Sequence, residues 1–233
     1  MEAVNHEAAR IRAALKTAGV PVAELSVYHG KGSGIRLRLQ GEEVTDISVL
    51  SGSKITMLTL RETAVTNLAP LKSCQIRSLS LHGSNISDIS ALEGSTFYLL
   101  DLTETAVTDL APVARITILD ELRLRGTRVS DITPLQKSTI RSLDIRDTAV
   151  TNLAPIVKMQ KLEKLDLTTP QLMQNLDVLR RVKIFVWEGG TNSFSTQGLA
   201  WEHRFGRYKE FFQTGPNKSV EPPRALPGAS GSP

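Results

Sequence analysis

Polar residues that recur at fixed positions of a repeating pattern are the ones whose types and spacing could do chemistry. One recurring position holds Arg61, His82, Thr103, Arg125 and Arg146, and a second holds Asp101, Arg123 and Asp144. A guanidinium offers paired donors that fit a carboxylate, so the first set predicts recognition of acidic groups on a partner. Acids that directly follow these residues would neutralise the arginines instead, and the opposite charges of the second set would pair across strands. We take both sets together as the candidate partner-binding site, with these alternatives open.

Constellations typical of catalysis, cofactors or metals are absent from the sequence. The four histidines, at positions 6, 29, 82 and 203, show no metal-ligand spacing, and the single cysteine, Cys74, permits no internal disulfide. The glycine-rich loop at 30–34 has its lysine before the second glycine, unlike a phosphate-binding loop. We therefore expect a protein that is not an enzyme and that holds no cofactor and no metal.

A repeat of 21 or 22 residues supplies the elements that must position the polar residues. Segments that resemble V-T-D-L-A-P-L begin at residues 44, 65, 86, 107, 129 and 150. Between them lie segments of the form L-x-x-L-x-L, whose apolar residues two apart fall on one face of a strand. This spacing predicts six strands of one parallel sheet, at 55–60, 76–81, 97–102, 119–124, 140–145 and 162–167. The intervening residues then point to solvent and form columns across neighbouring repeats.

Short polar residues predict how the chain returns from one strand to the next. About 15 of 21 residues remain for each return, too few for a crossover helix with two turns, so we expect one helical or 3₁₀ turn with proline at its first position. Asp or Asn is expected to cap the bend at 46, 67, 88, 109, 131 and 152. Ser or Thr hydroxyls are expected to bond backbone groups of the turn at 63, 84, 105, 127 and 148.

Two kinds of repeat alternate along the chain. Glu62, Glu104 and Asp147 lie at the ends of their strands, whereas Gly83 and Gly126 lie at the ends of the strands between them. Duplication of a two-repeat unit explains this alternation, and a binding role for the acids is the alternative.

The two ends of the chain depart from the repeat. Apolar residues at 4, 8, 11, 15 and 18 predict an amphipathic helix over 2–18, followed by a hairpin of 23–28 and 35–40. We divide the chain into a helical N-terminal cap (1–43), a repeat domain (44–190), an aromatic C-terminal cap (191–213) and a disordered tail (214–233). The last strand is expected at 182–187. Segment 201–212 is interpreted as a cap helix, with protein docking or single-stranded nucleic-acid binding as alternatives.

Composition and charge narrow the class of protein further. Twenty-eight Lys and Arg against 24 Asp and Glu give a net charge of +4, too small an excess to predict a nucleic-acid footprint. The sequence shows no secretion signal and no apolar run long enough to span a membrane. We therefore expect a cytoplasmic monomer that binds a protein partner.

The repeat resembles the internalin and SDS22-like class of short leucine-rich repeats over residues 44 to about 179. It is also similar to the leucine-rich arrays that follow protein-kinase domains in planctomycetes and related bacteria. The resemblance implies an α/β solenoid with a parallel sheet on the concave side and short 3₁₀ returns on the convex side. It implies a scaffold that recognises proteins, with a regulatory subunit or detached sensor domain of a signalling kinase as the alternative.

Overall fold

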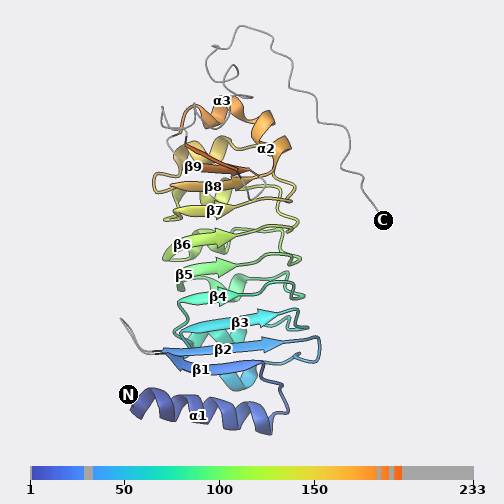
Figure 1. The fold of residues 1–233 in the computed structure, drawn as a ribbon, viewed down its shortest axis with the longest axis vertical. Helices are drawn as coiled ribbons and strands as arrows, with labels where there is room; N and C mark the ends of the chain where they lie inside the picture. Colours follow the sequence, from blue (N-terminus) through green and yellow to red (C-terminus); the bar gives the residue numbers. More distant parts are fainter. Residues whose placement is uncertain (1, 29–33, 183–184, 189–191, 196–233) are drawn as a thin grey trace.

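The structure, a computed structural model, describes residues 2–28, 34–182, 185–188 and 192–195. Its strands form one sheet in sequence order, stacked as successive rungs, with helix α1 beside the first rung and the 3₁₀ returns behind the sheet (Figure 1). The strands described are β1 (Glu24–Tyr28), β2 (Gly34–Gln40), β3 (Met57–Arg61), β4 (Ser78–Ser80), β5 (Thr96–Asp101), β6 (Ile118–Arg123), β7 (Ser142–Asp144), β8 (Lys164–Leu167), β9 (Phe185–Glu188) and β10 (Asn192–Ser195).

The sheet is parallel from β2 to β9, and antiparallel hairpins β1–β2 and β9–β10 flank it. The predicted parallel sheet is therefore confirmed, although four of its strands, such as β3 and β4, begin two residues later than expected. Their predicted first residues, such as Ile55 and Ile76, are buried but precede the ladder. The prediction that 182–187 holds the last strand is wrong, because β10 follows it.

Leucine, isoleucine and valine from both halves of each repeat fill the space between the sheet and the returns. Leu58 and Leu60 point inward from β3, while Val65, Leu68 and Leu71 point inward from the return that follows. Each of the five is at most 5% exposed, and all belong to one continuous core cluster. Because no repeat can bury these residues alone, the stability of the fold comes from contacts between neighbouring repeats.

Each return contains a short 3₁₀ helix, and an acid or amide caps the bend that leads into it. The helices are η1 (Ser48–Leu50), η2 (Ala69–Ser73), η3 (Ser90–Leu92), η4 (Val113–Arg115), η5 (Thr133–Lys137) and η6 (Ala154–Lys158). In all six, the Asp or Asn Oδ1 accepts a hydrogen bond of 2.8–2.9 Å from the backbone N–H two residues later. The predicted cap is thus confirmed, whereas proline lies at the second position of η2, η5 and η6, one place later than expected.

Hydroxyl groups close the turn that follows each strand. Ser84, Thr105, Thr127 and Thr148 each donate a hydrogen bond of 2.6–2.7 Å to the carbonyl oxygen three residues earlier. Thr63 occupies the same position, but its buried Oγ1 has no hydrogen-bond partner among the residues described. The predicted role of this position is therefore confirmed for four hydroxyls and wrong for Thr63.

Helix α1 (Glu2–Thr17) packs against the first rungs of the solenoid. Ala8, Ile11 and Leu15 on one face of the helix are buried in the same core as the repeats, and the helix contacts β1, β2 and η1. The predicted helix and hairpin therefore form. The four segment boundaries stay predictions, and most of 191–213, including 201–212, and all of 214–233 lie outside the described residues.

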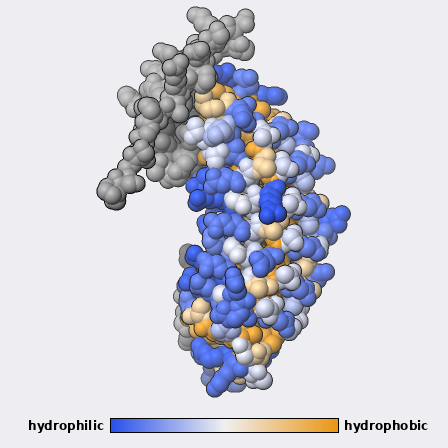
Figure 2. Space-filling model, turned by 90° about the vertical axis from the view of Figure 1, so that its right-hand side faces the viewer, coloured by the Kyte–Doolittle hydropathy of each residue, from blue (hydrophilic) through white to orange (hydrophobic). Residues whose placement is uncertain are grey.

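Two short helices, α2 (Thr169–Gln174) and α3 (Leu176–Leu179), replace the usual return after β8. Viewed from the side, the molecule is mostly hydrophilic, with hydrophobic residues gathered in a stripe along its length (Figure 2). Among the described residues, no helix has the length and apolar content needed to cross a membrane.

Candidate functional site

The parallel register places residues 21 or 22 apart side by side on the outer face of the sheet. We call this surface, made of the outward residues of β2 to β8 and of the residues that continue the outward alternation just beyond these strands, the sheet face. One column contains Arg36, Met57, Ser78, Leu99, Glu121, Ser142 and Lys164. The next contains Arg38, Thr59, Ser80, Asp101, Arg123, Asp144 and Asp166. The second column holds Asp101, Arg123 and Asp144 on neighbouring strands, as predicted from the sequence.

A third column continues the ladder at the ends of the strands. It contains Arg61, His82, Thr103, Arg125 and Arg146. Backbone hydrogen bonds of 2.8–3.0 Å connect this column from one repeat to the next. Glu62 N–H donates to the His82 carbonyl, and the Thr103, Arg125 and Arg146 carbonyls accept in the same way from Gly83, Glu104 and Gly126. The backbone therefore fixes this column as firmly as the two within the strands.

A groove of about 430 Å³ crosses the sheet face over β4 to β8. Its lining residues are His82, Asp101, Thr103, Glu121, Arg123, Arg125, Ser142, Asp144, Arg146, Lys164 and Asp166. Seven of the eight residues predicted from the sequence line it, and Arg61, the eighth, lies on β3 outside it.

The acids of the second column form the floor of this groove rather than its exposed surface. Asp101, Asp144 and Asp166 are only 7–9% exposed, although the strand alternation placed them facing solvent. The arginine side chains Arg123 and Arg125 are 43% and 50% exposed. Longer neighbours cover the short carboxylates, so the groove presents cations to solvent above a floor of buried acids.

Hydrogen bonds within the sheet satisfy the floor carboxylates. Asp101 accepts from the backbone N–H and hydroxyl of Thr103, at 3.0 and 2.6 Å, and from the Ser80 hydroxyl at 3.1 Å. Asp144 binds the Arg146 guanidinium through both carboxylate oxygens, at 2.9 and 2.6 Å. Arg123 pairs with Glu121 on its own strand, at 2.7 Å. The predicted cross-strand pairing of Arg123 with Asp101 and Asp144 is wrong, because both carboxylates already have nearer donors.

Acids outside the second column neutralise much of the third. Arg61 pairs with Glu62 at 3.0 Å and Arg125 pairs with Asp147 at 2.9 Å, and all four side chains are about half exposed. His82 Nε2 lies 3.5 Å from Glu104. The hydrogen bond from Arg61 lowers the pKa of Glu62. The alternative that neighbouring acids neutralise these residues is thus confirmed for Arg61 and Arg125, although solvent screens such exposed pairs and they contribute little to stability.

Two carboxylates lie next to each other in the floor of the groove. Asp144 and Asp166 are register partners on β7 and β8. Burial raises the pKa of Asp166, and the charge of Asp144 adds to this effect, while Lys164, at 3.0 Å, opposes it. Ionised Asp166 is therefore held in an unfavourable environment.

The alternation of acid and glycine after the strands has a packing explanation. Gly41, Glu62, Gly83, Glu104, Gly126 and Asp147 all have φ between 53° and 104°. A Cβ on Gly83 or Gly126 would lie 3.2 Å from the Cγ of Glu62 or Glu104. The acid of one repeat therefore lies over the glycine of the next, a contact that neither duplication alone nor a binding role predicts.

Arg36 and Arg38 are sheet-face residues that were missed from the sequence. The interpretation of 35–40 as part of a hairpin was right, but β2 also pairs in parallel with β3, which aligns Arg36 with Met57 and Arg38 with Thr59. The signal was present, because Leu37 and Leu39 have the spacing of Leu58 and Leu60.

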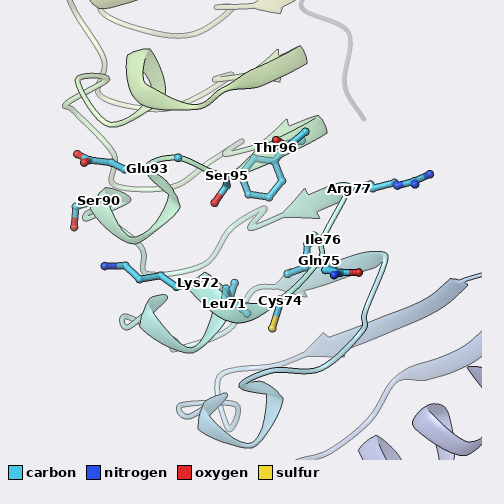
Figure 3. Close-up of a pocket in the computed structure, with 12 residues that line it drawn as sticks. Leu71, Lys72, Cys74, Gln75, Ile76, Arg77, Ser90, Glu93, Ser95 and Thr96 are labelled. Atoms are coloured by element: carbon cyan, nitrogen blue, oxygen red, sulfur yellow. The ribbon is translucent and has the colours of Figure 1, made fainter.

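A second hollow, of about 850 Å³, lies at the side of the solenoid between η2, η3 and the starts of β4 and β5. Figure 3 shows Lys72 and Glu93 extending to one side of this hollow and Arg77 to the other. The half-buried Cys74 thiol donates to the Leu50 carbonyl at 3.1 Å, and burial raises its pKa. A neutral, hydrogen-bonded thiol is a weak nucleophile, so this lining offers no activated sulfur.

Comparison with known proteins yields structural likenesses only. No family model and no curated protein matches the chain. An internalin C2 from Listeria monocytogenes is 25% identical over 55% of this chain and 61% of its own, with a TM-score of 0.48. Internalin InlF from the same organism is 21% identical over 78% and 68%, with a TM-score of 0.36. The functional domain of its InlJ is 15% identical over 66% and 53%, with a TM-score of 0.22.

The chain thus spans about 61% of the length of the internalin C2 structure. The resemblance to kinase-associated arrays stays a prediction. The parallel register, the capped 3₁₀ returns and the shared core make the chain a leucine-rich repeat solenoid.

Proposed function

We propose that the sheet face binds a protein partner and that the chain is a recognition module. The groove over β4 to β8 is the observation that carries this proposal, because it gathers polar side chains from five successive repeats. Solenoid proteins use such extended surfaces for binding. Exposed arginines above satisfied carboxylates favour a protein ligand, since guanidinium groups are prominent in the energetically important parts of protein interfaces.

The arginines suited to a test are those whose removal leaves the fold intact. Arg146 is unsuitable, because it holds the buried carboxylate of Asp144. Within the part of the chain that the structure describes, Arg123 pairs with Glu121 and Arg125 with Asp147, and neither arginine holds a floor carboxylate.

We predict that replacing Arg123 and Arg125 together by Gln leaves the melting temperature almost unchanged and weakens partner binding by roughly tenfold or more. The measurement is capture of native-host proteins on the immobilised chain, followed by titration of the protein identified. The control is Lys137→Gln with Lys158→Gln, which removes the same charge from the exposed returns η5 and η6. Equal affinity of the wild type and the arginine variant, or equal loss in the control, would move the site off the sheet face.

A further inference from the structure

We propose that the N-terminal half of the sheet face, over β2 to β4, binds an acidic segment of the protein partner whose carboxylates occupy alternate positions. This inference rests on the proposed function, because it gives the chemistry of the partner that the sheet face recognises. It concerns Arg36 and Arg38, which lie outside the groove over β4 to β8.

Charge is distributed unequally along the sheet face. The outward positions of β2 to β4 and the outward position two residues after β4 carry three arginines, Arg36, Arg38 and Arg61, and no acid. The corresponding positions of β5 to β8 carry four acids and four bases. The N-terminal half therefore attracts anions, whereas the C-terminal half is balanced.

Glu62 pairs with Arg61 at 3.0 Å, so the positive charge that is not cancelled in this half is that of Arg36 and Arg38. Arg38 is exposed, and its guanidinium has no ion pair or hydrogen bond among the described residues. Arg36 reaches Glu24 only at 4.0 Å, and its side chain is half exposed. By contrast, Asp144 holds Arg146 through two hydrogen bonds. Arg36 and Arg38 are thus available to an incoming carboxylate.

The spacing of these arginines fits an extended segment. Arg36 and Arg38 are two residues apart on β2, which corresponds to roughly 6.6–6.8 Å along a strand. Alternate side chains of an extended peptide have the same separation and point the same way. Thr59, the register partner of Arg38, and Ser78 and Ser80 on β4 add neutral hydroxyls without repelling charge. An acid-x-acid segment lying along the strands would place successive carboxylates on successive guanidinium groups.

The test uses the full chain and a fluorescein-labelled peptide with three glutamates separated by single threonines, followed by anisotropy at low ionic strength. We expect the peptide to bind and the double variant Arg36→Gln with Arg38→Gln to weaken binding at least fivefold. The variant Lys137→Gln with Lys158→Gln should bind normally, and a peptide with lysines in place of the glutamates should not bind. Matching thermal melts of the variants show that the fold is kept.

Three results would overturn the inference. The first is that the wild type fails to bind the glutamate peptide. The second is that the variant Arg123→Gln with Arg125→Gln loses at least as much affinity as the Arg36 and Arg38 variant. The third is that an oligothymidine of equal length binds more tightly through the same arginines, which would make the ligand a nucleic acid. If the peptide experiment fails, the proposed function still stands. It is tested separately, by titrating the captured partner against the variant of Arg123 and Arg125.

Discussion

Hydroxyl groups at the end of each strand show what a single side chain contributes to the repeat. Thr105 and Thr127 are buried and close the turn by donating to the strand carbonyl. Thr63 is equally buried, yet its hydroxyl has no partner among the described residues. A buried hydroxyl without a partner costs free energy, whereas a hydrogen-bonded one contributes to stability.

We predict that Thr105→Val lowers the free energy of unfolding by about 0.5–1.5 kcal/mol, because a carbonyl loses its donor. The same substitution at Thr63 should be neutral or stabilising, because no hydrogen bond is lost. Denaturant unfolding of the two variants measures both changes. Equal destabilisation at the two positions would show that the Thr63 hydroxyl finds a partner in solution.

Asp166 is a residue whose charge opposes folding. Its folded-state pKa is raised, first by burial and then by Asp144, so the proton binds more tightly in the folded chain than in the unfolded one. Its contribution to stability is therefore present below the unfolded pKa and is lost as pH rises through the folded pKa.

Replacing Asp166 by Asn should consequently raise the melting temperature at pH 7, because the variant has no charge to bury at this position. The advantage of the variant over the wild type should shrink as the pH falls toward about 4, the range in which an unperturbed Asp takes up its proton. Thermal melts of both proteins across this pH range provide the measurement. An advantage that stays constant or grows at low pH would contradict the raised pKa.

At the scale of the element, one residue in the turn after each of the strands β2 to β7 adopts positive φ. Gly126, with φ 70°, accepts this conformation easily, but Glu104, with φ 58°, is a residue that rarely adopts it. Glu104 lies over Gly126, so the two positions are coupled. The free energy of this coupling can be measured by substituting both residues.

We predict that Gly126→Ala destabilises the chain more than Gly94→Ala. Both glycines have positive φ, but a Cβ on Gly94 would meet nothing within 4 Å, whereas a Cβ on Gly126 would lie 3.2 Å from Glu104 Cγ. The shared φ strain should cost about 1 kcal/mol at each position. In a Glu104→Ala background the excess cost of Gly126→Ala should vanish, as a double-mutant cycle can measure. An excess that persists there would place its cause in the backbone.

Much of the element structure could be predicted because the repeat carries its own periodicity. The spacing of Leu58 and Leu60 predicted the inward face of β3. The positions of Asp88 and Asn152 predicted the caps, because both features depend only on residues close in sequence. The double role of β2 was missed, because one strand pairs antiparallel with β1 and parallel with β3. The ion pairs could not be predicted either. Arg123 pairs with Glu121 because Asp101 and Asp144 already accept hydrogen bonds from other residues, and the sequence does not show this.

At the scale of the whole molecule, stacking turns a short repeat into one long surface. Residues separated by 21 or 22 positions become neighbours, so that His82 and Asp166 line the same groove. The same stacking leaves β2 to β4 cationic and β5 to β8 balanced. A partner that covers the sheet face would therefore meet two regions of different charge.

The central claim is that a protein partner covers this sheet face, and the accessibility of introduced thiols tests it most directly. In a Cys74→Ser background, single cysteines would replace Ser78 and Ser142 on the sheet face and Lys137 on the return η5. We predict that the bound partner slows thiol labelling roughly tenfold or more at positions 78 and 142, because the centre of a protein interface excludes water, and leaves labelling at 137 unchanged. Protection at 137 with undiminished labelling at 78 and 142 would contradict the account.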